Sequence, residues 1–404
     1  MRKLIAVMVV LSGSALLSAQ ESALTLEQAL DRARNRAPLI LSAQDRIEEA
    51  RGRLRGASVL FQNNPQLDGA VGRRNSFGTT RTDVEVGFSQ VLETGGQRGA
   101  RMAGAQAGID RETSAKQDVM RRLVADVARA HATALATQER LRLARKADEV
   151  ATSLQRSMER RLEVGDVPLL DANLARAAAA RTRAEVRAGE AELALALGDL
   201  KLFLGMASSE PIAVTGAVPW AQTFDRQALV TSAQDRPEIR VAAAELRQAE
   251  SEIRLGSGLA KPDIGVGGRY ERDDGANVAK ATLSLTLPIF NRGQELTAVG
   301  SAKATRLRRE IDATKRAIQV EVETALDAYK QRADAATDLQ QNALRLIDEN
   351  EQLAQRSHEE GEISLIELLL IRRDALEIRR LHTDTLLEAA LAAIEVQSRA
   401  GVLQ

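Results

Sequence analysis

The stretch Thr82-Asp-Val-Glu-Val-Gly-Phe-Ser-Gln-Val-Leu-Glu-Thr-Gly-Gly-Gln-Arg98 contains two structural signals in succession. Its first half alternates valine and phenylalanine with polar or small residues, a period of two that is typical of a strand with one apolar face. After Gly95 and Gly96 the alternation stops, and a run rich in Ala, Arg, Glu, Gln and Leu begins. Because glycine tolerates backbone dihedrals that other residues avoid, we expect the chain to turn here from a strand into a helix.

The same succession occurs a second time in the chain. Anchor residues recur in the same order at offsets between 199 and 196 residues: Gln28 and Gln227, Pro38 and Pro237, Pro65 and Pro262, Gly96 and Gly293, and Gly165 and Gly361. Two long copies predict an internally duplicated domain and not a solenoid of short repeats. We place the first repeat at 24–205, a linker at 206–225 and the second repeat at 226–404, with both repeats intertwined in one domain.

Long helices are the main feature expected of each repeat. Residues 97–163 and 294–360 are good helix formers with apolar positions at three- and four-residue steps. At 1.5 Å per residue each helix would extend roughly 100 Å, which suits a tube or a spacer. Glycine-containing breaks then predict turns around Val164-Gly165-Asp166 and Gly361-Glu362, followed by return helices at about 169–205 and 364–402.

The strand pattern predicts a membrane β-hairpin ahead of each long helix. We expect strands at about 66–75 and 82–92, and at about 263–271 and 279–289, with polar loops at 74–81 and 271–278 and with Pro288 and Gly293 at the second strand–helix junction. Alternation of apolar and polar residues over this length fits a bilayer-crossing strand, although an amphipathic sheet packed on a soluble core is the alternative. Four strands cannot close a barrel, because about eight are needed, so we expect an obligate oligomer that pools its strands.

The N-terminus and the composition indicate an exported protein. Residues 1–19 have the basic start, apolar stretch and small residues of a cleaved signal peptide, and a membrane-spanning helix is the alternative reading. The chain has no cysteine, which is compatible with a bacterial envelope. The balance of 56 basic and 56 acidic residues argues against a nucleic-acid partner.

No enzyme constellation, cofactor motif or metal site is predicted. His131, His358 and His382 lack metal-ligand spacing, and we expect each to lie solvated on a helix face. The glycines at 265, 267 and 268 lack the spacing and the following helix of a nucleotide site.

These features resemble the TolC-like outer-membrane efflux proteins. The resemblance covers the opening Leu24-Thr-Leu-Glu-Gln-Ala-Leu30, the two strand–helix junctions, and the two glycine tips with the acidic residue that follows each. It implies a fold that is mainly α with membrane β: a homotrimer whose 12-stranded outer-membrane barrel continues as an α-helical tunnel through the periplasm of a Gram-negative bacterium. It also implies two partners, a periplasmic adaptor and an inner-membrane transporter of the RND type.

The substrate is predicted from a weaker likeness. The junction Leu92–Arg98 resembles that of the cobalt-zinc-cadmium branch of the family, but a purely structural junction explains its glycines as well. We place heavy-metal export first, export of drugs or organic solvents second, and type I protein secretion third. A soluble periplasmic coiled-coil scaffold is the alternative of a different class.

The resemblance also assigns roles to residues near the tips. Asp171 and Glu367 match acidic residues that line the entrance in the family, where a carboxylate ring would favour cations. Capping or solvation of the return helix is the alternative for Asp171. Leu370 stands where the family often has a second acid, which argues against a double ring. The tip residues (Val164, Gly165, Asp166, Gly361 and Glu362) are candidates for adaptor docking, although a structural turn would also require the glycines.

Overall fold

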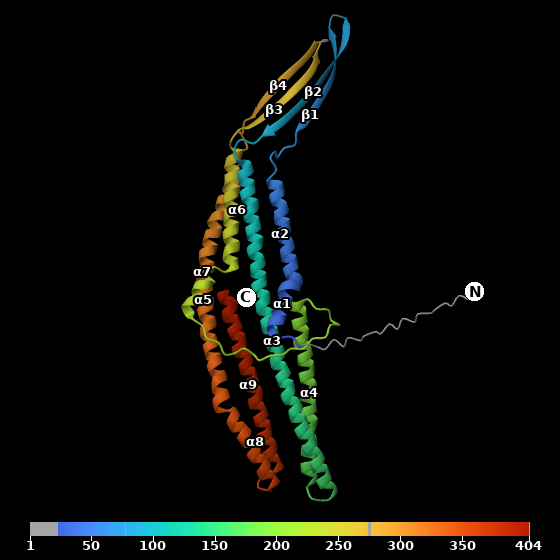
Figure 1. Cartoon of the computed structure of the whole chain (residues 1–404), viewed down its shortest axis with the longest axis vertical. Helices are drawn as coiled ribbons and strands as arrows, with labels where there is room; N and C mark the ends of the chain where they lie inside the picture. The colour runs from blue at the N-terminus through green and yellow to red at the C-terminus, as the bar shows by residue number, and fades with distance from the viewer. Residues whose placement is uncertain (1–22, 77, 274–275, 404) are drawn as a thin grey trace, which may run out of the picture.

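The computed structural model describes residues 23–76, 78–273 and 276–403, which form an elongated molecule (Figure 1). A β-sheet lies at one end, long helices make up the body, and two hairpin tips lie at the opposite end. Within the described residues no helix has an apolar stretch long enough to cross a bilayer. The predicted signal peptide at 1–19 falls outside the described residues.

The two repeats contain the same elements in the same order, as the duplication predicted. The first has α1 (Leu26–Arg36), α2 (Pro38–Ala57), β1 (Gln66–Ser76), β2 (Thr79–Leu92), α3 (Gln97–Glu163) and α4 (Leu169–Leu204). The second has α5 (Arg226–Ala233), α6 (Pro237–Leu259), β3 (Asp263–Asp273), β4 (Ala276–Thr286), α7 (Gln294–Asn342), α8 (Leu344–Glu359) and α9 (Leu365–Ala400). Residues 205–225 connect α4 to α5 across the middle of the molecule (Figure 1).

The recurring sequence anchors mark helix starts. Thr25 caps α1 in a capping box with Gln28, and the Asp225 carboxylate accepts the Gln227 N–H at the start of α5. Pro38 and Pro237 are the first residues of α2 and α6, where the missing proline N–H costs no helical hydrogen bond. Each repeat therefore uses the same local signals to begin its helices.

The prediction of one unbroken helix at 294–360 is wrong. The helix is divided at Ala343, whose dihedrals are φ −109° and ψ −50°. The break is local, because the Ala343 N–H still donates to the Leu339 carbonyl at 3.1 Å and the Ile347 N–H donates to the Ala343 carbonyl at 3.0 Å. A distortion of one residue changes neither composition nor periodicity, so the sequence pattern did not indicate it.

The described strands form one four-stranded antiparallel sheet in the order β1-β2-β3-β4. Pairing of β2 with β3 joins the two repeats, with Val86 opposite Tyr270. The predicted alternation is confirmed. Large apolar side chains are exposed on one face: Leu67, Val71, Val86, Phe88, Tyr270, Leu283 and Leu285. On the other face Arg269 pairs with Asp68 at 3.2 Å and with Glu85.

The strand boundaries differ from the prediction at the loops and at one junction. The predicted loops at 74–81 and 271–278 lie largely within the ladders, where Arg74 is opposite Arg81 and Glu271 is opposite Val278. Polar side chains extend the strands because they pair across them, as Lys280 does with Glu271 at 2.5 Å. Strand β4 ends at Thr286 and not at 289, shortly before Pro288, which has no N–H for a ladder.

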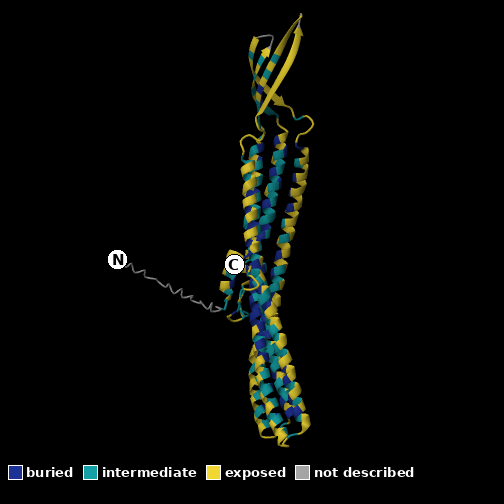
Figure 2. Ribbon diagram, turned by 90° about the vertical axis from the view of Figure 1, so that its right-hand side faces the viewer, coloured by how far each residue is buried: buried dark blue, intermediate teal, exposed yellow. Residues whose placement is uncertain are grey.

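The helical core is richest where the two repeats meet in the middle of the body (Figure 2). Alanines at 125, 128, 132 and 136 of α3 pack in one cluster with Leu387 and Ile394 of α9. Small side chains let the two helices approach closely. Elsewhere much of each helix surface is exposed (Figure 2).

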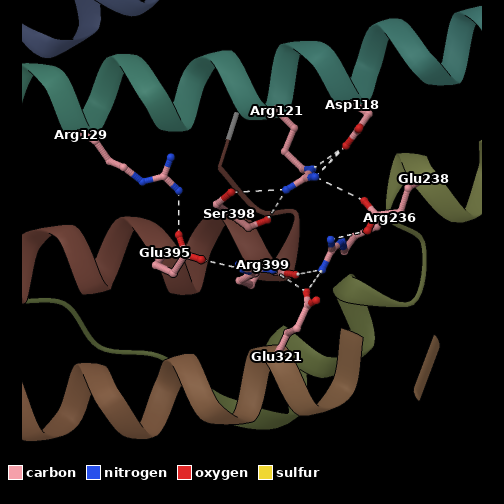
Figure 3. Close-up of polar contacts among 9 residues, drawn as sticks. All are labelled: Asp118, Arg121, Arg129, Arg236, Glu238, Glu321, Glu395, Ser398 and Arg399. Carbon is pink, nitrogen blue, oxygen red and sulfur yellow. Dashed lines mark hydrogen bonds and ion pairs between the residues drawn. The ribbon is translucent and has the colours of Figure 1, made fainter. Parts of the chain in front are cut away.

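An ion-pair network holds α3, α6, α7 and α9 together in the same region (Figure 3). Arg236 is 5% exposed, and its guanidinium pairs with Glu238 and, at 3.2 Å, with Glu321. Arg399 pairs with Glu321 at 2.9 Å and with Glu395 at 2.6 Å. Because a buried guanidinium is costly without a counter-charge, removing one carboxylate should weaken the contact between the repeats.

Arg121 and Arg129 extend the network onto α3. Arg121 pairs with Glu238 at 3.3 Å and donates to the Ser398 carbonyl at 3.0 Å, while Arg129 pairs with Glu395 at 2.7 Å. Burial raises the pKa of Glu321, but the hydrogen bonds from Arg399 and Arg236 outweigh it, so the pKa lies below its ordinary value. The Glu321 carboxylate therefore remains charged at moderately acidic pH.

We predict that Glu321→Gln lowers the thermal stability of the detergent-solubilised protein at neutral pH. A carboxylate with a lowered pKa contributes stability above its unfolded pKa, and that contribution is lost as the pH falls through its folded value. The deficit of the variant should therefore shrink as the pH is lowered from about 7 to about 3. Thermal unfolding followed by circular dichroism over this range measures it.

Glu349→Gln is the matched control, since Glu349 is exposed on α8 and has no hydrogen bond or ion pair within the described ranges. It should unfold like the parent at every pH. A Glu321→Gln deficit that stays constant down to the lowest pH would contradict the assigned role of the charge.

Candidate functional site

The two hairpin tips are built by the same turn, at the end of the molecule farthest from the sheet (Figure 1). In the first, the Asp166 N–H donates to the Arg161 carbonyl at 2.8 Å; in the second, the Glu362 N–H donates to the Ser357 carbonyl at 2.8 Å. Gly165 and Gly361 have φ values of +77° and +81°, the left-handed conformation that ends a helix in this motif. The predicted breaks are therefore confirmed as tight turns.

The tip side chains are exposed. Val164 is 80% exposed, and the side chains of Asp166 and Glu362 are also exposed. Just above the turns Met158 and Ala175 of the first hairpin pack with Leu365 of the second. The structure thus brings the two tips together through an apolar cluster and leaves their outer ends accessible.

Glu367 has a structural partner that the sequence analysis missed. Its carboxylate accepts hydrogen bonds from the N–H and hydroxyl of Ser364, both at 2.8 Å, while the Ser364 hydroxyl accepts the Glu367 N–H at 3.3 Å. This reciprocal capping box starts α9, and the Ser-x-x-Glu spacing would have indicated it. The backbone and hydroxyl hydrogen bonds from Ser364 lower the pKa of Glu367, so the exposed carboxylate stays ionised.

Asp171 occupies the corresponding place at the start of α4. It lies in the first turn, half-buried, and its N–H donates to the Pro168 carbonyl at 3.1 Å. Among the described residues its carboxylate has no hydrogen bond or ion pair, so the capping alternative does not apply, and solvation or a pore role is left for this side chain. Within one chain Asp171 and Glu367 share the end of the molecule but are not joined by a direct polar contact.

The strand–helix junctions are packed around glycines of α6. Gly96 and Gly293 are the N-cap residues of α3 and α7, with φ values of +81° and +70°. A Cβ on Gly95 would lie 2.1 Å from the Gly258 carbonyl oxygen, and one on Gly293 would lie 2.3 Å from the Gly256 carbonyl oxygen. Of the predicted junction glycines, Gly95 is needed for the close backbone crossing, Gly96 for the turn, and Gly293 for both. Pro288 lies between the end of β4 and this crossing.

We predict that Gly293→Ala destabilises the protein by about 1–3 kcal/mol from backbone strain alone, with a further loss from the clash with α6. Thermal unfolding measures it. Gly99→Ala is the control, because Gly99 of α3 has an ordinary φ and a Cβ added there would meet nothing within 4 Å. The control should be neutral or slightly stabilising. Equal unfolding temperatures for the two variants would show that the close backbone crossing does not contribute to stability.

The expectation that each histidine lies solvated on a helix face is wrong for His131, whereas His358 and His382 are half-buried. His131 is 2% exposed, its Nε2 bonds the Leu24 carbonyl oxygen at 3.0 Å, and burial lowers its pKa against the effect of that bond. Burial also lowers the pKa of His382, while His358 Nδ1 lies 3.1 Å from the Ile363 carbonyl oxygen. Across the part of the chain that the structure describes, His, Cys, Asp and Glu side chains form no group of three or more arranged to hold a metal ion.

The family model described as "Outer membrane efflux protein" matches residues 29–206 and 228–401, once in each repeat. The chain belongs to this family, and the predicted TolC-like resemblance is confirmed. It is an efflux channel component of the outer membrane, extending into the periplasm, and not an enzyme.

Two relatives are metal-resistance proteins. The chain is 23% identical over 382 residues to the cobalt-zinc-cadmium resistance protein CzcC of Cupriavidus metallidurans, covering 94% of this chain and 90% of the relative. It is 25% identical over 273 residues to the nickel-cobalt-cadmium resistance protein NccC of Alcaligenes xylosoxydans xylosoxydans, covering 63% of this chain and 60% of the relative.

Solved structures share the fold. The TM-score is 0.75 to CusC, with 19% identity over 93% of this chain and 91% of the other. It is 0.77 to a membrane protein from Pseudomonas aeruginosa, with 20% identity over 93% and 90%. It is 0.74 to the CmeC outer membrane channel of Campylobacter jejuni, with 16% identity over 93% and 85%.

Proposed function

We propose that this chain forms the passive exit duct of a tripartite efflux system and that its cargo is a heavy-metal cation. The likeness to CzcC over 94% of the chain carries the cargo assignment. The duct supplies no energy in this proposal: an inner-membrane transporter of the RND type drives export, and a periplasmic adaptor connects the two. The exposed tips, with Val164 and Gly165 at one and Gly361 at the other, are the surfaces offered to the adaptor.

The edges of the sheet support a homotrimer. Among the described residues, β1 and β4 each pair along one edge only, and the apolar face of the sheet is exposed. Exposed strand edges pair with other strands unless they are protected. Three copies would give twelve strands with every edge closed and the apolar face turned to lipid.

The entrance is proposed to lie at the tips, where three copies of Glu367 and Asp171 would surround the pore. Carboxylate rings favour cations over anions. Glu367 has two separable roles in this arrangement, because a glutamine can still accept the Ser364 hydrogen bonds but carries no charge.

We predict that Glu367→Gln and Glu367→Ala both shift the cation preference of purified channels in planar bilayers toward unity. Only the alanine variant should also lower the thermal stability, since it removes the capping box. Ion selectivity is measured from reversal potentials in a salt gradient, with the oligomer mass determined on the same preparation. Unchanged selectivity in both variants would assign Glu367 to capping alone, and a non-conducting monomer would refute the duct.

We predict for the cargo that deleting the gene lowers the tolerance of its host to cobalt, zinc or cadmium ions, and that the parent gene restores it. Growth in graded metal concentrations measures the effect, with an organic dye and a detergent as control toxicants. Unchanged metal tolerance with increased sensitivity to the organic compounds would replace the metal cargo by a drug or solvent.

A further inference from the structure

A cavity of about 300 Å³ lies between the two hairpins, lined by α3, α4, α8 and α9 and open on one side. It falls between two kinds of contact. Toward the middle of the helical body, called the waist here, the hairpins are joined by polar pairs: Arg380 pairs with Glu185 at 2.8 Å, and Arg140 pairs with Asp384 at 2.6 Å. On the side of the tips they are joined by the apolar cluster of Met158, Ala175 and Leu365. Anything bound in the cavity would touch both hairpins.

The wall of this cavity is strongly cationic. Its charged lining residues are Arg142, Lys146, Arg181, Arg372, Arg373 and Arg379 against Asp348 and Glu351. Both acids form ion pairs with the same arginine, because Arg379 pairs with Asp348 and with Glu351 at 2.6 Å each. The two carboxylates on the wall therefore compensate only Arg379, and the other five cations of the wall have no acidic partner within the wall itself.

Carboxylates outside the wall neutralise three of the other cations. Arg142 pairs with Glu139 at 2.7 Å, Arg181 with Glu185 at 3.3 Å and Arg373 with Asp374 at 3.1 Å. Lys146 and Arg372 differ from these. Within the described ranges neither of them has a carboxylate at ion-pair distance.

Arg372 is the under-compensated group. Its guanidinium donates to the neutral Gln355 side chain, and its Nε is buried without a hydrogen-bond partner. Burial lowers the pKa of Arg372, although the more distant charges of Glu351 and Glu359 oppose this. Arg372 is half-buried, and withdrawing a guanidinium from water without a counter-ion is costly. The free volume beside it has room for a counter-ion.

We propose that this cavity binds a small multivalent oxyanion of the phosphate type, held between Arg372 of α9 and Lys146 of α3. Guanidinium groups bind phosphate oxygens through two parallel hydrogen bonds, and lysine adds a point charge. The bound anion bridges the two hairpins and stabilises the arrangement described above. Binding by the purified protein does not depend on the transport role proposed for the chain.

The test is calorimetric titration of the detergent-purified full chain with inorganic pyrophosphate, at constant ionic strength set with sodium chloride. We expect saturable binding and a higher unfolding temperature at saturation. Arg372→Gln and Lys146→Gln should each weaken binding by about tenfold or more, because each removes a charge-assisted hydrogen bond. Orthophosphate titrated in the same way shows whether one phosphate group is sufficient.

Arg183→Gln is the matched control, since Arg183 is exposed on α4 one residue beyond the cavity wall and has no ion pair in the described part of the chain. It should bind like the parent. Unliganded unfolding temperatures verify that each variant is folded, and Lys146→Gln alone decides the question if Arg372→Gln does not fold. Absence of saturable binding to the parent, or equal binding by Lys146→Gln and Arg183→Gln, would overturn the proposal.

Discussion

The antiparallel pairing of β2 with β3 is the contact on which the arrangement of this molecule depends. It joins the hairpin of the first repeat to that of the second, so that α3 and α7 begin at the same end of one sheet, on either side of α6. Between their starts the end of α6 fits only because backbone meets backbone at Gly95 with Gly258 and at Gly293 with Gly256. The direction of both long helices, and hence the meeting of both tips at the far end, follows from this crossing.

Contacts between the repeats change in character along the body. At the waist, alanines let α3 approach α9, and arginine–carboxylate pairs fix their register. Toward the tips the ion pairs between the repeats become fewer. A cationic cavity separates the two hairpins there, and beyond it the apolar cluster of Met158, Ala175 and Leu365 joins them again. Because the network at the waist includes the buried guanidinium of Arg236 and the contact nearest the tips is a small apolar cluster, the tips are the less firmly joined part of the helical body, which is consistent with the entrance proposed there.

Much of this fold was predictable because its signals are local and occur twice. Alternation identified both hairpins, and glycine at Gly165 and Gly361 identified both tips. Three features were not predicted for physical reasons. The break at Ala343 leaves periodicity intact, the polar strand ends are stabilised by cross-strand pairs such as Lys280 with Glu271, and His131 is buried by a segment more than a hundred residues away in sequence. The capping box of Glu367 is local and can be predicted from the Ser364-x-x-Glu367 spacing.

The sequence by itself determined the duplication, the succession of strand and helix, the positions of the turns and the family, because each depends on residues that are neighbours in the chain. Only the tertiary structure decided which side chains from the two repeats meet. The Arg236 network, the close approach of Gly293 to α6 and the cavity lined by Lys146 and Arg372 bring together residues far apart in sequence. Such contacts depend on how helices with long, Ala-rich and nearly uniform surfaces are aligned, and local pattern does not contain that alignment.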